Sequence, residues 1–224
     1  MNEKLKITEL FDLTASAAGE YLKKYTYPWE ALADIASIIR EIGAKLPEEE
    51  YDKRGEEIWI HKSAHVFDSA YIAGPCIIGP RTEVRQCAFI RGKALVGADC
   101  VVGNSTELKN VILFDHVQVP HYNYVGDSIL GTWSHMGAGS ITSNVKSDKK
   151  LIVIKGPDGN IETGIKKIGA FLGDHVEIGC GSVLNPGTIV GRGSNVYPLS
   201  SVRGYVPEKS IYKKASEIAA KREE

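Results

Sequence analysis

The sequence predicts a mainly β chain wound as a left-handed parallel β-helix. Two observations support this fold class: an aliphatic residue recurs at every sixth position, and a small residue usually lies two positions before it. The aliphatic positions are Ile60, Val66, Ile72, Ile78, Val84, Ile90, Val96, Val102 and Leu108 in a first run, and Leu172, Ile178, Leu184, Val190, Val196 and Val202 in a second. A period of six fits neither an α-helix nor a plain alternating strand. It fits short strands joined by tight corners, with the aliphatic side chains pointing into a narrow prism.

The repeat also predicts how the chain is organised. Residues 58–206 are expected to form the β-helix domain, with an inserted loop at 145–167 whose two extended arms flank a Pro-Asp-Gly turn. Residues 1–57 are expected to form a helical segment and a connector, because apolar residues follow Pro28 at helical spacing as far as Gly43. A C-terminal helix over 207–224 is expected to cover the last coil.

Composition narrows the classes of function. Among 224 residues, 27 Lys and Arg against 28 Asp and Glu give a net charge of −1, which provides no electrostatic reason to expect nucleic acid or an anionic membrane as a partner. No apolar run approaches the ~20 residues of a membrane span, and the first residues lack the apolar core of a signal peptide. The four cysteines form no CxxC pair. The sequence therefore predicts a cytoplasmic protein.

A prism filled with aliphatic side chains leaves no internal pocket, so a functional site is expected on the outside. Prisms of this shape expose apolar side faces, which predicts a homotrimer with grooves between subunits. The densest stretch of polar and titratable residues is 91–144, which includes His116, His121 and His135. Histidine there suits acyl transfer from a thioester, because the attacking amine loses a proton to a base with a pKa near neutral.

Three segments in this stretch give a more specific resemblance. They are GNSTELKN at 103–110, HYNYVGDSI at 121–129 and MGAGSITSN at 136–144. With their spacing, they resemble the acetyltransferase half of bacterial bifunctional N-acetylglucosamine-1-phosphate uridylyltransferases/glucosamine-1-phosphate acetyltransferases, over roughly residues 78–205. Residues 1–57 contain no glycine-rich phosphate loop, so no nucleotidyltransferase activity is expected.

The resemblance implies roles for individual residues. It implies that His121 is the catalytic base, that Arg91 and Lys109 hold a sugar phosphate, and that Tyr124 contacts the acceptor. The family position before the glycine turn, an acceptor-contacting asparagine, is His135 in this chain. The positions expected to lie near acetyl-CoA are Gly137, Ala138, Gly139, Asn144 and Cys180. The backbone N–H groups of the 137–139 turn are candidates for the oxyanion site.

The expected activity is N-acetyl transfer from acetyl-CoA to an amino-sugar phosphate, as in UDP-N-acetylglucosamine biosynthesis, with no metal required. Besides His135, the chain has Val145 where the family has tyrosine and Cys180 where it has serine. These departures leave open a non-catalytic sugar-phosphate-binding or scaffold protein.

A metal hydratase of the γ-carbonic-anhydrase type is a further alternative. His116 and His121 have the His-x4-His spacing that such enzymes use for zinc, but no histidine lies between residues 66 and 115 to supply the third ligand.

Overall fold

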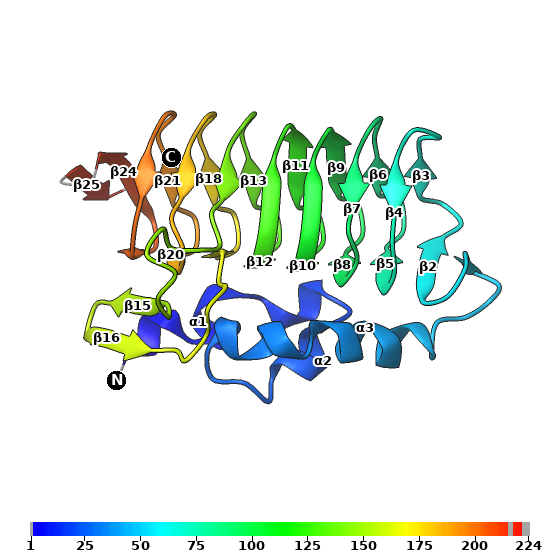
Figure 1. Ribbon diagram of the computed structural model, residues 1–224, viewed down its shortest axis with the longest axis horizontal. Helices are drawn as coiled ribbons and strands as arrows, with labels where there is room; N and C mark the ends of the chain where they lie inside the picture. The colour runs from blue at the N-terminus through cyan, green and yellow to red at the C-terminus, as the bar shows by residue number, and fades with distance from the viewer. Residues whose placement is uncertain (1, 215–216, 221–224) are drawn as a thin grey trace.

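A row of stacked three-sided coils forms the body of the protein, with a helical segment lying along one side (Figure 1). This computed structural model describes residues 2–214 and 217–220. Each coil contributes three short strands, and each strand pairs in parallel with its equivalents in neighbouring coils. The predicted parallel β-helix is therefore confirmed. From Ile78 to Leu108, and throughout the second run, every aliphatic residue expected to point inward is buried.

The coils build three faces. The first face contains β2 (Ile58–His61), β5 (Cys76–Ile78), β8 (Ala94–Val96), β17 (Ala170–Leu172), β20 (Thr188–Val190) and β23 (Tyr205–Val206). The second face contains β4 (Tyr71–Ile72), β7 (Phe89–Ile90), β14 (Ile141–Thr142), β19 (Val183–Leu184) and β22 (Ser201–Val202). The third face contains β3 (His65–Val66), β6 (Glu83–Val84), β9 (Val101–Asn104), β11 (Gln118–His121), β13 (His135–Met136), β18 (Glu177–Ile178), β21 (Asn195–Val196) and β24 (Ser210–Lys214). Two longer strands, β10 (Glu107–Leu113) and β12 (Tyr124–Leu130), run along the second face, turn a corner and continue along the first.

The N-terminal segment is a chain of short helices. It comprises the 3-10 helices η1 (Glu3–Leu5), η2 (Leu13–Ala15) and η3 (Pro28–Ala33), and the α-helices α1 (Ile7–Leu10), α2 (Gly19–Leu22) and α3 (Ile35–Gly43). Pro28 begins η3 with the fixed φ that favours a helix start. The helix expected from Pro28 to Gly43 is therefore two helices, which meet at Asp34. The connector contains a strand that was not predicted, β1 (Tyr51–Lys53), which pairs antiparallel with β2.

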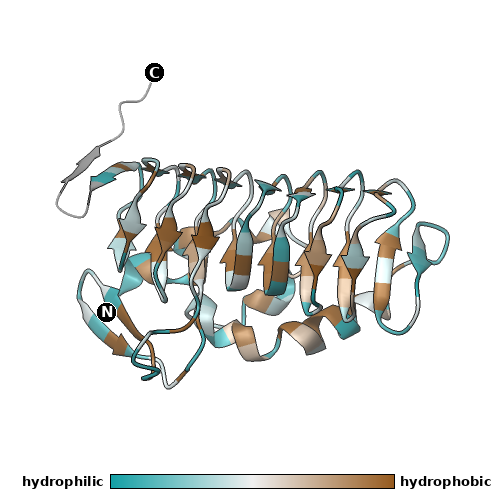
Figure 2. Ribbon diagram, turned by 45° about the horizontal axis from the view of Figure 1, so that its top comes forward, coloured by the Kyte–Doolittle hydropathy of each residue, from teal (hydrophilic) through white to brown (hydrophobic). Residues whose placement is uncertain are grey.

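The N-terminal segment covers the first face. On that face the outward side chains form one register-aligned stripe: Trp59, Ile77, Leu95, Ile112, Ile129, Phe171, Ile189 and Tyr205. Figure 2 shows apolar colour on these strands and on the helices beside them. Helix α3 packs here through Ile35, Ile38, Ile39 and Ile42, all buried. Each such isoleucine contributes about 1.5–3 kcal/mol through burial.

Between β14 and β17 the chain leaves the coils and forms a hairpin. Strands β15 (Val153–Gly156) and β16 (Gly159–Glu162) pair antiparallel around a turn at Pro157 and Asp158. The coil register is unaffected, because β12 pairs directly with β17 and β14 with β19. The N-terminal segment also contacts the hairpin, where the Asn2 side chain donates to the Gly159 carbonyl at 3.1 Å.

The prediction of a helix over 207–224 is wrong for the described residues. Residues 210–214 form β24, which pairs in parallel with β21, and 217–220 form β25 (Glu217–Ala220), antiparallel to β24. The physical reason is that the last coil presents unpaired backbone N–H and C=O groups, and an added strand satisfies them where a helix would not. Among the described residues no helix is long and apolar enough to span a membrane.

Candidate active site

His121, Ala138 and Cys180 lie one above another where the third face meets the second. The register Gln118↔His135↔Glu177 relates β11, β13 and β18. Three residues further along each coil, this register brings His121, Ala138 and Cys180 to equivalent positions. Two backbone hydrogen bonds fix the stack: the Gly139 N–H donates to the His121 carbonyl at 3.0 Å, and the Gly181 N–H to the Ala138 carbonyl at 2.8 Å. We call His121, Ala138 and Cys180 the corner column.

The corner column presents a base and a hydrogen-bond donor to solvent. All three residues are exposed, and the His121 imidazole has no partner within residues 2–214 and 217–220. Of the turn expected to supply oxyanion donors, the Gly137 N–H donates to the Ile178 carbonyl at 2.7 Å and the Gly139 N–H is used in the stack. The Ala138 N–H has no partner in the same described ranges. A base and a free donor on adjacent coils, about 4.8 Å apart, can act on one reacting carbonyl.

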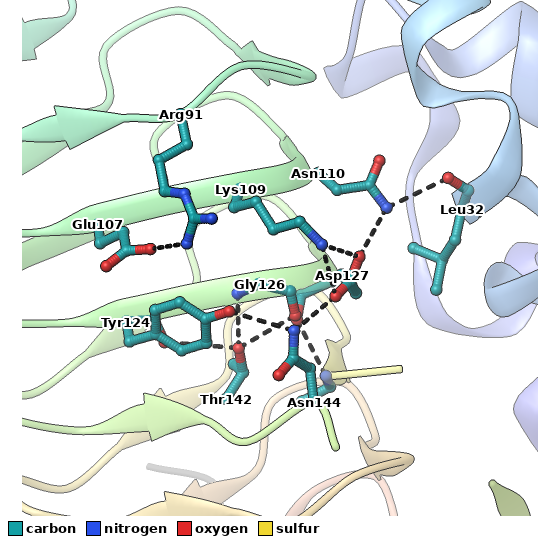
Figure 3. A network of polar contacts seen from close by, with 12 residues as sticks. Leu32, Arg91, Glu107, Lys109, Asn110, Tyr124, Gly126, Asp127, Thr142 and Asn144 are labelled. Carbon is teal, nitrogen blue, oxygen red and sulfur yellow. Dashed lines mark hydrogen bonds and ion pairs between the residues drawn. The ribbon is translucent and has the colours of Figure 1, made fainter. Parts of the chain in front are cut away.

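A second group of predicted residues forms a hydrogen-bonded network where the second face meets the first (Figure 3). Its centre is Asp127, which is buried. Its carboxylate is 3.1 Å from the Lys109 ammonium and accepts hydrogen bonds from the side-chain amides of Asn110 (2.9 Å) and Asn144 (2.5 Å). The Asn144 amide also donates to the Tyr124 hydroxyl at 3.1 Å. We call Lys109, Asn110, Tyr124, Asp127 and Asn144 the edge network.

Local backbone geometry explains why asparagine and aspartate occupy this corner. Asn110 and Asp127 have φ values of 56° and 49°, in the left-handed region that these two residue types tolerate best after glycine. Turning there, β10 and β12 bring the two side chains together on adjacent coils. The Asn110 amide also donates to the Leu32 carbonyl at 3.2 Å, so the edge network is joined to the N-terminal segment. Burial, followed by the nearby Asp127 carboxylate, raises the pKa of Tyr124.

Arg91 lies one coil before Lys109 on the same face, as expected from the sequence. Its guanidinium donates to Glu107 at 2.7 Å, and both side chains are substantially exposed. Arg91 and Lys109, the two cations expected to hold the sugar phosphate, therefore each have a carboxylate partner already. The two pairs differ in kind: Glu107 is partly solvated, whereas the Asp127 side chain is only 5% exposed.

The structure separates His135 from both groups. Its ring nitrogen Nδ1 lies 2.8 Å from the Glu177 carboxylate on the third face, which orients the ring. His116 lies before the start of β11, at the opposite end of the third face from His121, and is stacked on Trp133 with ring centroids 4.0 Å apart. No three His, Cys, Asp or Glu side chains gather as metal ligands in the part of the chain that the structure describes. His116 and His121 do not share a site within one chain.

Asp127, Asn110, Glu107 and Glu177 were missed by sequence reasoning. Asp127, Glu107 and Glu177 each pair with a predicted residue of an adjacent stacked coil, and Asn110 donates to Asp127. The available signal was the coil length: Asp127 follows Lys109 by 18 residues, one full turn of three hexads. Stacked positions at that separation could have been paired in advance.

The fold and the corner column define a β-helix protein of the hexapeptide-repeat class. A family model described as the GMPPB C-terminal domain matches residues 72–192. The chain belongs to this family.

Relatives with assigned names agree with the resemblance that the sequence predicts. The chain is 28% identical over 221 residues to the bifunctional protein GlmU of Methanococcus maripaludis, covering 97% of this chain and 53% of that protein. It is 30% identical over 157 residues to a bifunctional sugar-1-phosphate nucleotidylyltransferase/acetyltransferase of Sulfurisphaera tokodaii, covering 70% and 39%. The chain thus spans about half the length, or less, of these curated relatives. The predicted kinship with hexapeptide-repeat acyltransferases is confirmed.

Solved structures of similar shape include a hexapeptide transferase family protein from Anaplasma phagocytophilum. Its TM-score is 0.42 at 14% identity, covering 75% of this chain and 80% of that one.

Proposed function

We propose that this protein transfers an acetyl group from acetyl-CoA to the amine of an amino-sugar phosphate and has no nucleotidyltransferase activity. The observation that supports this most directly is the corner column, whose imidazole and adjacent Ala138 N–H have no partner among the residues that the structure describes. The names of the sequence relatives, which include acetyltransferases, support the same class of reaction.

The chemistry follows from the positions of these groups. The acceptor amine attacks the thioester carbonyl carbon while His121 removes the amine proton. The Ala138 N–H donates to the oxyanion that forms, and the adjacent Cys180 flanks the path of the thioester. As the carbon–sulfur bond breaks, the imidazolium returns its proton to the CoA thiolate. No metal takes part in this scheme.

The acceptor phosphate is assigned to Arg91, because the guanidinium offers a two-pronged donor and its present partner Glu107 is partly solvated. Lys109, held by Asp127, contributes positive potential at the same edge. Tyr124 and His135 are proposed to contact the acceptor, and Asn144 the donor.

A homotrimer would place these groups in a groove between subunits. The first face is already covered by the N-terminal segment, so assembly is proposed through the other two faces; Tyr71 and Phe89 are exposed on the second. Sedimentation should show three subunits at micromolar concentration. A stable monomer would remove the groove from the scheme.

His121→Ala tests the reaction. Turnover of acetyl-CoA with glucosamine-1-phosphate should fall by roughly two to four orders of magnitude, with an unchanged circular dichroism spectrum. His116→Ala is the matched control, because this histidine lies in the same coil but stacks on Trp133. A wild-type protein that binds glucosamine-1-phosphate without any thioester turnover would favour the non-catalytic alternative.

A further inference from the structure

The molecule has a polar hollow where the β15–β16 hairpin lies against the last coils. A cavity of about 330 Å³ opens there, and its lining includes Lys146, Lys155, Arg203 and the corner glycines Gly187 and Gly204. Another hollow of about 300 Å³ shares Lys146 and Arg203 with it. We call Lys146, Lys155 and Arg203, together with the space they line, the hairpin pocket.

The hairpin pocket has an excess of positive charge. Its lining contains three cations and a single carboxylate, Asp148, which leaves two positive charges. Asp148 pairs with Lys146 at 3.3 Å. Arg203 donates to the neutral side-chain oxygen of Asn185 at 3.2 Å. Neither Arg203 nor Lys155 has an acidic partner among the described residues. In a chain of net charge −1, this local excess in a concave site favours an anionic ligand.

Packing holds the hairpin side of this pocket in place. Ile154 in β15 and Ile152 directly before it are buried. A Cβ atom on Gly187 would lie 2.9 Å from the Ile154 side chain, and one on Gly204 would lie 3.3 Å from Cβ of Lys155. Both glycines have left-handed φ values, +79° and +84°. These bare corners therefore let the hairpin approach closely, so Lys155 projects from a docked strand.

The hairpin pocket lies on the same edge of the prism as the proposed acceptor site. The second-face register joins Phe89, Glu107, Tyr124, Ile141, Val183 and Ser201. Two residues further along their coils, Arg91, Lys109 and Arg203 occupy equivalent positions. Arg203 therefore lies on the same edge as Arg91 and Lys109, separated from Lys109 by the uncharged equivalents Gly126, Ser143 and Asn185.

We propose that the hairpin pocket binds a phosphate group of one of the substrates. This proposal rests on the proposed function for the identity of the ligand, and on the charge and packing above for the site. Guanidinium and ammonium groups in a concave site suit phosphate oxygens. Two sources share this chemistry: the phosphates of CoA, which the proposed function requires, and the diphosphate of a nucleotide-linked amino sugar, which would replace the acceptor proposed above.

Calorimetric titration of the full chain tests the proposal. Wild type, Arg203→Gln and Lys155→Gln are titrated with CoA, dephospho-CoA, a UDP-linked amino sugar and inorganic pyrophosphate. Lys149→Gln is the matched control, an exposed lysine of the same insertion that does not line the pocket. We expect both pocket variants to bind at least one ligand about tenfold more weakly, while the control binds like wild type.

The pattern of losses identifies the source. Weaker binding of CoA alone assigns the 3′-phosphate, weaker binding of CoA and dephospho-CoA assigns the CoA diphosphate, and weaker binding of the UDP-linked sugar assigns the acceptor. Unchanged binding of all four ligands in both variants overturns the proposal, and so does the absence of binding to wild type. Binding without acetyl transfer would instead refute the proposed function and leave the pocket standing.

Discussion

The first and second faces share the same kind of buried inward residues, but their outward side chains differ in polarity and exposure. On the first face the outward row, including Ile77, Ile112 and Phe171, is apolar and buried under the N-terminal helices. On the second face the equivalent row, including Phe89, Glu107 and Tyr124, is exposed or half-buried. The inward residue of each hexad therefore stabilises the β-helix. The outward residue decides whether a face is covered or left open for ligands and subunits.

The largest difference between the two faces is expected when one outward phenylalanine on each is replaced by alanine. Phe171→Ala is expected to lower the free energy of unfolding by about 3–5 kcal/mol, because it leaves a cavity beside Trp29. Phe89→Ala, with 41% of its surface exposed, should lower it by no more than about 1 kcal/mol. Urea denaturation measures both.

Protein concentration sharpens this comparison. The Phe171→Ala loss arises within one chain and should not depend on concentration. If Phe89 lies in a subunit contact, the loss of stability caused by Phe89→Ala should change with protein concentration, because dilution separates the subunits. Equal losses at every concentration would contradict the assignment of one face to the chain and the other to assembly.

Replacing Lys109 and replacing Arg91 should have different effects. Lys109→Met leaves buried Asp127 with its two amide donors only, so we expect a loss of about 1.5–3 kcal/mol in the free energy of unfolding. Arg91→Ala should leave stability unchanged and raise the acceptor KM roughly ten- to a hundredfold, with the acetyl-CoA KM unaffected. The test substrates are glucosamine-1-phosphate and glucosamine. Equal effects on both would show that Arg91 does not hold the phosphate.

The smallest effect concerns pH at the covered face. Asp174 joins that side of the coils to the N-terminal segment, accepting the Asp12 N–H at 2.7 Å, and burial raises its pKa. A raised carboxyl pKa means that the folded state binds the proton more tightly than the unfolded state. The contribution of this group therefore favours folding increasingly as pH falls through the folded pKa toward the ordinary Asp value, and opposes folding above it. Asp174→Asn should remove this component from denaturation curves in mildly acidic buffer. An identical pH dependence in the variant would rule it out.

The interior of the coils could be predicted from sequence because its signal is local and repeated. Both runs of inward aliphatic residues are buried from Ile78 onward, and the hexads fix their register. Val66 and Ile72 are only partly buried because they lie in the first coil, which lacks a neighbour on one side. The C-terminal helix was mispredicted because composition favoured a helix, whereas the open edge of the last coil favoured a strand.

The covered face and the edge network were harder to predict, because they depend on contacts between coils and with a distant segment, which the six-residue pattern does not contain. Every third hexad has an apolar residue directly before its inward one, as in Ile77-Ile78 and Leu95-Val96, and that 18-residue period signals a covered face. The segment that covers it is distant in sequence and could not be matched to it by pattern. Likewise Lys109 was identified, but its pairing with Asp127 required the stacking register. His121 was found because its surrounding motif is local.

The long-range contacts that fix the N-terminal segment have a consequence for folding during synthesis. Asn2 bonds to Gly159, Asp12 to Asp174 and Lys4 to Glu208, contacts that span 157, 162 and 204 residues. On the ribosome, residues 2–46 emerge before any of these partners exists. Helix α3 can pack once β5, β8 and β10 have been made, but residues 2–12 must wait for the hairpin and the last coils. Residues 2–12 are thus fixed later than the segment that follows them, and slow translation through residues 160–208 would lengthen the time for which Leu5, Ile7 and Leu10 stay accessible to chaperones and to aggregation.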